Sequence, residues 1–204
     1  MTTSSRSGSS RAGRRWASLL RDLRHGGLAG GVRQTRFADF GATDTVSTSY
    51  ELLPLLLGPV LVDGDVFVDV GCGRGRVLNW VVEDGRAASV FGLELDKVIA
   101  ASVARRFTDR LDVTIVAGDA LGSLPDAGSV FYMWHPFERP LMARFVETFL
   151  RKYRCLGRLN EVRLVYHNCL HADLWESAAG ARVTPIELPA GERHKAVLVT
   201  FLAE

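Results

Sequence analysis

The stretch that decides the fold is VFVDVGCGRG, residues 66–75. Its first five residues form a nearly continuous apolar run rich in valine, which is typical of a strand buried on both faces of a sheet. Three glycines follow at alternate positions, and an apolar helical pattern comes directly after them. Glycine adopts positive φ at a tight turn and lets a ligand approach the backbone, while the first turn of a helix offers unpaired N–H groups. The stretch therefore predicts a strand, a ligand-binding turn and a helix.

Short apolar runs alternate with longer helical patterns along the rest of the chain. Strands are predicted at 66–70, 89–95, 113–117, 129–134, 162–167, 183–188 and 196–202. Helices are predicted at 48–57, 75–83, 97–110, 139–153 and 172–179. This alternation indicates an α/β fold with a parallel sheet and helices on both faces. The last two strands are joined by a short turn, so they must pair antiparallel as a C-terminal hairpin.

Composition excludes several classes of protein. The chain has 204 residues and a mass of 22.4 kDa, with 47% hydrophobic and 24% charged residues, so it can bury a core and is neither disordered nor collagen-like. Its three cysteines, at 72, 155 and 169, have no CxxC spacing and indicate reduced thiols in a cytoplasmic protein, with neither a metal site nor disulfides. The apolar stretch 52–57 is far short of the roughly 20 residues that span a bilayer, so no membrane partner is expected.

The charge is concentrated at the N-terminus. Residues 1–36 hold eight arginines and one acid, whereas the remainder is net acidic. We expect residues 1–15 to be disordered, and Trp16, Leu19, Leu20 and Leu23 predict a short basic amphipathic helix after them. This helix either docks on the domain, lies at its edge, or contacts an acidic or nucleic-acid partner. The composition fits a transit peptide as well as a bacterial tail. The expected division is a basic, partly disordered tail over 1–36 and one domain over 37–204.

The spacing of the three glycines distinguishes between two types of cofactor-binding motif. A dinucleotide fingerprint would place its third glycine where this chain has Arg76. The spacing D-x-G-x-G-x-G in VFVDVGCGRGRVL instead resembles the first motif of class I S-adenosylmethionine-dependent methyltransferases. The resemblance extends over about residues 45–204. It implies a Rossmann-like, doubly wound, mostly parallel seven-stranded sheet, S-adenosyl-L-methionine as the cofactor, and methyl transfer as the activity.

The same resemblance implies which residues bind the cofactor. Glu94 ends a predicted strand where the family has an acid that holds the ribose hydroxyls, and Asp119 stands where a carboxylate accepts from the adenine amino group. Cys72 is expected to contribute its backbone rather than thiol chemistry. The complete expected set is Asp69, Gly71, Cys72, Gly73, Gly75, Glu94, Leu95, Asp119, Ala120 and Trp134.

Two residues are candidates for catalysis. His135-Pro136-Phe137 occupies the place of the family's Asn/Asp-Pro-Pro-Tyr/Phe motif, with histidine in place of the amide or acid. His135 is either a general base or a residue that caps the turn before Pro136. Tyr50 is either an active-site aromatic residue or part of the core.

The acceptor and the activity itself leave alternatives open. A small-molecule acceptor is favoured, and a protein or nucleic acid held by the basic tail is the alternative. A non-catalytic, cofactor-binding accessory protein of the same fold is the rival function, followed by a nicotinamide oxidoreductase, which Arg76 disfavours.

Overall fold

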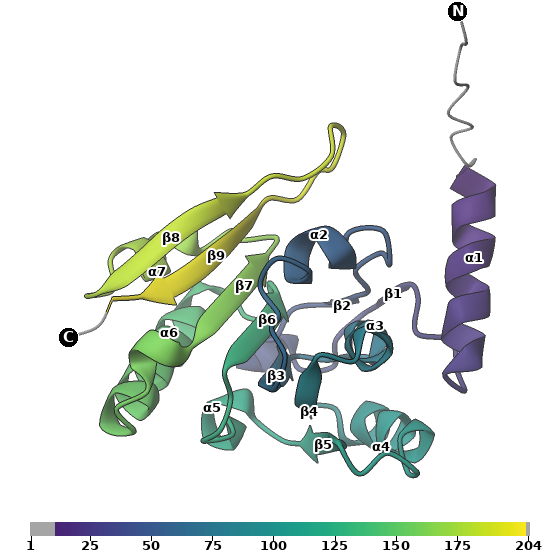
Figure 1. Cartoon of the computed structure of the whole chain (residues 1–204), viewed down its shortest axis with the longest axis horizontal. Coiled ribbons are helices and arrows are strands. Elements are labelled where there is room, and N and C mark those ends of the chain that lie inside the picture. The colour runs from purple at the N-terminus through teal and green to yellow at the C-terminus, as the bar shows by residue number, and fades with distance from the viewer. Residues whose placement is uncertain (1–10, 203–204) are drawn as a thin grey trace, which may run out of the picture.

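The computed structural model describes residues 11–202 and contains one seven-stranded sheet in the order β5-β4-β3-β6-β7-β9-β8 (Figure 1). Its strands are β3 (Asp65–Val70), β4 (Ala87–Glu94), β5 (Val113–Ala117), β6 (Val130–Trp134), β7 (Arg163–His167), β8 (Ala181–Ile186) and β9 (Ala196–Phe201). Strands β3 to β7 pair in parallel, and β9 is antiparallel to both β7 and β8. The expected mostly parallel sheet with a C-terminal hairpin is confirmed.

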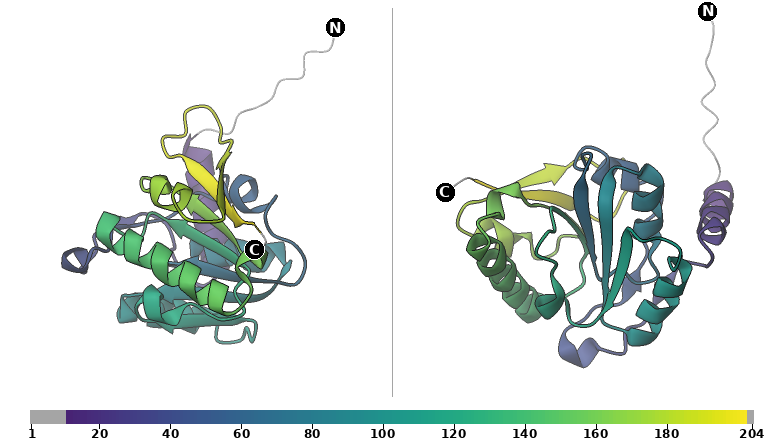
Figure 2. Two further views of the ribbon diagram at one scale, coloured as in Figure 1. Left: turned by 90° about the vertical axis from the view of Figure 1, so that its left-hand side faces the viewer. Right: turned by 60° about the horizontal axis from the view of Figure 1, so that its bottom comes forward.

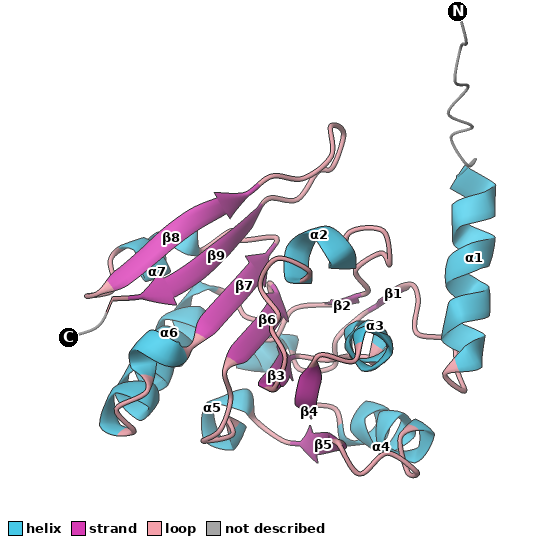
Figure 3. Ribbon diagram, in the orientation of Figure 1, coloured by secondary structure: helices cyan, strands magenta, loops and turns pink. Residues whose placement is uncertain are grey.

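Helices cover both faces of the sheet, and each face has its own cluster of buried apolar side chains (Figure 3). One face packs against α2 (Leu53–Leu57), α3 (Arg76–Asp84) and α4 (Lys97–Arg106). The other face packs against α5 (Ala120–Ser123), α6 (Arg139–Cys155) and α7 (Ala172–Glu176). Strand β3 lies between the two clusters and is buried along nearly its whole length, which explains its mostly apolar sequence.

The strand order reverses direction between β3 and β6, because the chain runs outward from β3 to β5 and then returns to start β6 on the other side. Connections that leave in opposite directions open a crevice outside the carboxyl ends of these strands, where α/β sheets bind ligands. The glycine turn after β3 lies at that crevice.

The structure corrects some predicted boundaries. The helix predicted at 48–57 is only Leu53–Leu57, with Pro54 in its first turn, where proline is well tolerated. The helix predicted at 97–110 ends at Arg106 and that predicted at 172–179 ends at Glu176. Strand β8 lies two residues earlier than predicted, because its pairing with β9 ends where Ile186 faces Ala196.

The N-terminal segment forms α1 (Arg11–Arg24) and a small antiparallel pair, β1 (Val32–Arg33) and β2 (Thr45–Val46). Short 3₁₀ turns occur at Ala38–Phe40 and Leu159–Glu161. Of the residues expected to be disordered, 11–15 are helical, and 1–10 lie outside the described residues. No helix among residues 11–202 is long and apolar enough to cross a membrane.

Helix α1 is attached to the domain through its polar side. Asp22 is only 1% exposed; its carboxylate accepts from the Arg76 guanidinium at 2.5 Å and from the Tyr50 hydroxyl at 2.8 Å. Arg21 and His25 both contact Glu83 on α3. The predicted amphipathic helix therefore docks on the domain, but Trp16, Leu20 and Leu23 stay exposed and, of its leucines, only Leu19 is half-buried.

We predict that Asp22→Ala lowers the free energy of unfolding by about 3–5 kcal/mol, because it leaves the largely buried Arg76 guanidinium without its counter-ion. Glu83→Ala is the control: it removes a half-exposed carboxylate from the same helix contact and should cost at most about 1 kcal/mol. Urea denaturation of both variants measures the difference. Equal losses would show that the buried pair does not anchor α1.

Candidate active site

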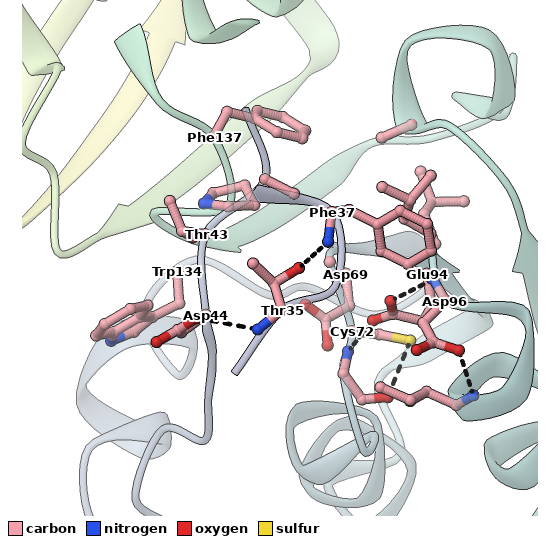
Figure 4. A pocket seen from close by; sticks show the side chains of 18 of the residues that line it. Thr35, Phe37, Thr43, Asp44, Asp69, Cys72, Glu94, Asp96, Trp134 and Phe137 are labelled. Carbon is pink, nitrogen blue, oxygen red and sulfur yellow. Dashed lines mark hydrogen bonds between the residues drawn. The ribbon is translucent and has the colours of Figure 1, made fainter. Parts of the chain in front are cut away.

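A cavity of about 460 Å³ lies in the crevice outside the carboxyl ends of β3, β4 and β6. Its floor is the glycine turn, and residues 34–48, here called the cover segment, close it from above (Figure 4). Four loops that are far apart in the sequence meet here, following β3, β4, β5 and β6. The predicted cofactor-binding residues that line the cavity are Asp69, Gly71, Cys72, Gly73, Glu94, Leu95, Asp119, Ala120 and Trp134.

The glycine turn requires glycine for two reasons. Gly71, Gly73 and Gly75 have φ of 80°, 51° and 74°, a region that L-residues other than glycine rarely adopt. A Cβ atom on Gly71 would also lie 3.2 Å from the Cβ atom of Pro136, so the turn passes close to the loop after β6. Gly75 does not line the cavity; it is the residue immediately before α3.

The Glu94 carboxylate joins the ends of β3 and β4. Its Oε2 atom accepts from the backbone N–H of Gly73 at 2.8 Å, and its Oε1 atom accepts from the backbone N–H of Asp96 at 2.8 Å. Burial raises the pKa of Glu94. Each carboxylate oxygen has a second lone pair, so Glu94 can also accept from the hydroxyls of a ligand.

Asp96 connects this loop to the cover segment. Its side chain accepts from Val98 N and Ile99 N and so caps α4, and it pairs with Arg36 of the cover segment at 2.7 Å. The Arg36 guanidinium and the backbone donors hold the pKa of Asp96 below its usual range, against the opposing effect of burial. The contact links closure of the cavity to the loop that follows β4.

Asp69 supplies an unpaired acceptor. The residue is 2% exposed, and its Oδ2 atom has no hydrogen-bond partner among the described residues. Burial raises the pKa of Asp69 well above its ordinary value, and the neighbouring Glu94 carboxylate raises it further. A buried acceptor at a cavity wall is costly when unsatisfied, so the site suits a ligand with cationic or hydroxyl donors. The ammonium and ribose groups of S-adenosylmethionine meet that requirement.

Asp119, Ala120 and Cys72 complete the wall of the cavity. The Asp119 side chain accepts from Leu121 N at 3.0 Å and so caps α5, while Ala120 lines the cavity beside it. Cys72 is buried, and both burial and the nearby Asp69 and Glu94 carboxylates raise the pKa of its thiol. A protonated, buried thiol is a poor nucleophile, which agrees with a backbone role for this residue.

The two predicted catalytic side chains do not line the cavity. The His135 ring is buried on the other side of its strand end, where its Nδ1 atom lies 2.9 Å from the Tyr166 hydroxyl and the ring centroid lies 5.0 Å from that of His171. Burial and His171 lower the pKa of His135. The Tyr50 hydroxyl donates to Asp22 and accepts from Asn79, so this residue belongs to the contact that holds α1.

The backbone of His135 nevertheless touches the cover segment. Its carbonyl accepts from the Thr43 hydroxyl, and its φ of 36° is in the left-handed region. Thr43 N donates to the Pro136 carbonyl at 3.2 Å, and Glu138 N donates to the Gly41 carbonyl at 2.8 Å. The turn after β6 therefore holds the cover segment over the cavity.

Sequence reasoning missed the cover segment and the tyrosine beneath it. Tyr132 lines the cavity, and its hydroxyl lies 2.5 Å from Thr48 Oγ1 and 3.2 Å from His167 Nδ1. Burial lowers the pKa of His167 to about 4, so its ring is neutral at pH 7. The hydroxyl-rich run TDTVST at 43–48 was the available signal, but nothing local indicates that it folds over the glycine turn.

Comparison with known proteins identifies the family of the central domain. Residues 67–156 match the family model of the methyltransferase domain. No curated protein sequence matches the chain.

Several solved structures share the fold. The tRNA methyltransferase TrmK (M1A22) of B. subtilis is similar with a TM-score of 0.60 at 16% identity, over 77% of this chain and 67% of that one. Sp1610 of Streptococcus pneumoniae, solved with S-adenosyl-L-methionine, has a TM-score of 0.55 at 20% identity, over 74% of this chain and 72% of that one. The mitomycin 7-O-methyltransferase MmcR has a TM-score of 0.57 at 17% identity, over 76% of this chain and 55% of that one.

The matched region runs from β3 to the end of α6 and contains the glycine turn, Glu94 and Asp119. The similar structures have the same layered sheet, and the cavity has the acceptors that a nucleoside with an ammonium group requires. Residues 67–156 therefore form a methyltransferase domain, and the fold around them is that of S-adenosylmethionine-dependent methyltransferases.

Proposed function

We propose that this protein is an S-adenosylmethionine-dependent methyltransferase that methylates a small-molecule acceptor bound in the cavity under the cover segment. Bound S-adenosylmethionine supplies an electrophilic methyl group. The chain's own residues bind and orient the two reactants and exclude water, which is where much of the rate enhancement of such a transfer arises. Asp69 and Glu94 would hold the amino-acid and ribose parts, and Asp119 the adenine.

The closure of the cavity carries this proposal. Its volume of about 460 Å³ is in the lower part of the range of about 300–1,000 Å³ found for ligand sites, and the cofactor must share it with the acceptor. Thr43 and Glu138 fasten the cover segment to the turn after β6, and Ala42 forms a β-bridge with Phe137. An acceptor of limited size fits under this cover without its removal.

The acceptor end of the cavity is both polar and aromatic. Asp44 lines it from the cover segment, and Trp134 and Phe137 line it from the end of β6 and the turn beyond (Figure 4). Aromatic walls favour a planar or cationic group, and the Asp44 carboxylate can accept a hydrogen bond from it. This combination suits an amine or hydroxyl on a compact, partly apolar molecule.

A nucleic-acid acceptor is the second candidate. Residues 1–36 carry eight arginines and one acid, and the structurally similar TrmK acts on tRNA. A base extruded from an RNA could enter the cavity if the cover segment moved aside. In that case the methyl acceptor would be a macromolecule bound largely by phosphate contacts.

The acceptor class can be measured directly. The full chain is incubated with methyl-labelled S-adenosylmethionine and a cell extract divided into a low-molecular-weight filtrate, RNA and protein. We expect label in a small product from the filtrate. Label in RNA that is lost after ribonuclease treatment would identify the second candidate and overturn the first, and no label in any fraction would favour a binding protein.

We predict that cofactor affinity falls on acidification, and that protonation of Glu94 contributes to the fall together with that of Asp69. The raised pKa of Glu94 means that the carboxylate is lost at a higher pH than for an ordinary glutamate, and ribose hydroxyls then lose a charged acceptor. Glu94→Gln should weaken binding at pH 8 by about 1–3 kcal/mol and flatten its pH dependence. Asp112→Asn, which removes an outlying carboxylate, is the control for charge. Calorimetry that gave the wild-type pH profile for Glu94→Gln would remove Glu94 from the site.

For His135 we predict a positioning role. Asparagine tolerates the left-handed backbone that His135 adopts, so His135→Asn should keep kcat within about tenfold and leave the pH–rate profile unchanged. His135→Val disfavours that backbone and should loosen the cover segment, which would raise the KM of the acceptor. A general base would instead lose about 10²–10⁴-fold in kcat in both variants, and that result would refute the positioning role.

A further inference from the structure

Helix α1 presents an apolar stripe to the outside of the molecule. Trp16, Leu20 and Leu23 are 64%, 56% and 52% exposed, and Leu28 beyond the helix is 55% exposed. The first three are spaced at helical intervals and therefore share one side of α1. Figure 2 shows this helix at the edge of the domain, with its outer side away from the sheet and its helices.

The orientation of the stripe is fixed from the opposite side. Asp22 is held in its buried contact with Arg76, and Arg21 and His25 both contact Glu83. A rotation of α1 that turned Leu20 and Leu23 inward would break the buried ion pair between Asp22 and Arg76, which is strongly destabilising. The outward direction of the apolar stripe is thus built into the fold.

The charge of this segment indicates what covers the stripe. Helix α1 has five arginines and a single acid, Asp22, whose charge is already balanced by Arg76. Eight of the chain's basic residues lie in its first 36 positions, whereas the rest is net acidic. An arginine-rich helix with tryptophan and leucines on one side and a low mean hydropathy is typical of helices that lie in a membrane interface.

We infer that α1 binds the surface of an anionic phospholipid membrane, with Trp16, Leu20 and Leu23 inserted among the lipids and the net positive charge of residues 1–36 attracting the headgroups. The stripe is on a helix at the edge of the domain. A fluid bilayer can surround such a helix, whereas a flat protein surface would contact only part of it. The contact needs no membrane-spanning segment, so it is compatible with the absence of a spanning helix among the described residues.

Two other occupants fit less well. RNA would pair its phosphates with the arginines but would leave the leucines in water. A second copy of the chain would place two helices of the same positive charge against each other. The membrane accounts for the apolar stripe and the arginines together.

The inference is tested by sedimenting the full chain with phosphatidylcholine vesicles, with and without phosphatidylglycerol. We expect binding only to the anionic vesicles, weaker at high salt. Leu20→Asp should weaken it at least about tenfold, whereas Leu111→Asp, which makes the same change at a fully exposed leucine far from α1 in the sequence, should bind like the wild type.

Fluorescence gives a second measurement that needs only the wild-type fold and one mild substitution. Brominated anionic lipids should quench tryptophan emission in the wild type, and Trp16→Phe should remove most of that quenching. No binding to anionic vesicles, or equal binding by Leu20→Asp and the wild type, would overturn the inference. RNA binding that Leu20→Asp abolishes, without vesicle binding, would assign the surface to RNA instead.

Discussion

The site depends on one carboxylate, that of Glu94. Its two oxygens accept from the backbone N–H groups of Gly73 and Asp96, which belong to loops following neighbouring parallel strands. Parallel strands cannot be joined by a tight turn, so their carboxyl ends come together only through the sheet and through contacts of this kind. With Glu94 in place, the glycine turn has a fixed shape and Asp96 is positioned to pair with Arg36. The floor of the cavity and its cover are therefore connected through a single buried side chain.

The same carboxylate also sets the electrostatics of the cavity. Glu94 and Asp69 are both buried, and each of their pKa values is raised. A ligand that brings a positive charge and hydroxyl donors relieves both the repulsion and the unsatisfied Asp69 oxygen. A pyrophosphate would add negative charge beside two carboxylates, which is the physical reason why a dinucleotide suits this turn poorly.

Much of the fold could be predicted from the sequence because it follows from local patterns. The apolar run of β3 and the glycines after it are explained by burial on both faces and by positive φ, and the alternation of strands and helices determines the layers. The residues expected to bind the cofactor lie at strand ends within or beside those patterns. Helix ends were less predictable, since the end of α4 at Arg106 depends on how the following turn packs.

Long-range contacts could not be predicted. Thr43 and Thr48 reach residues more than 80 positions away, and no periodicity relates the cover segment to β6. The direction of α1 was equally inaccessible, because an amphipathic pattern shows that one side is apolar but not which side faces the domain. Asp22, a lone acid among arginines, makes that choice by pairing with Arg76. His135 illustrates the same limit: its position after β6 was predicted, and the direction of its ring was not.

Hydrogen–deuterium exchange with and without S-adenosylhomocysteine, the product of the cofactor, tests the central claim that the cofactor binds between the Glu94 loop and the cover segment. We predict slower exchange in four stretches, 34–48, 71–77, 94–99 and 118–121, and unchanged exchange in the C-terminal hairpin. Protection confined to other parts of the sheet, or no protection while the ligand is bound, would contradict this account of the site.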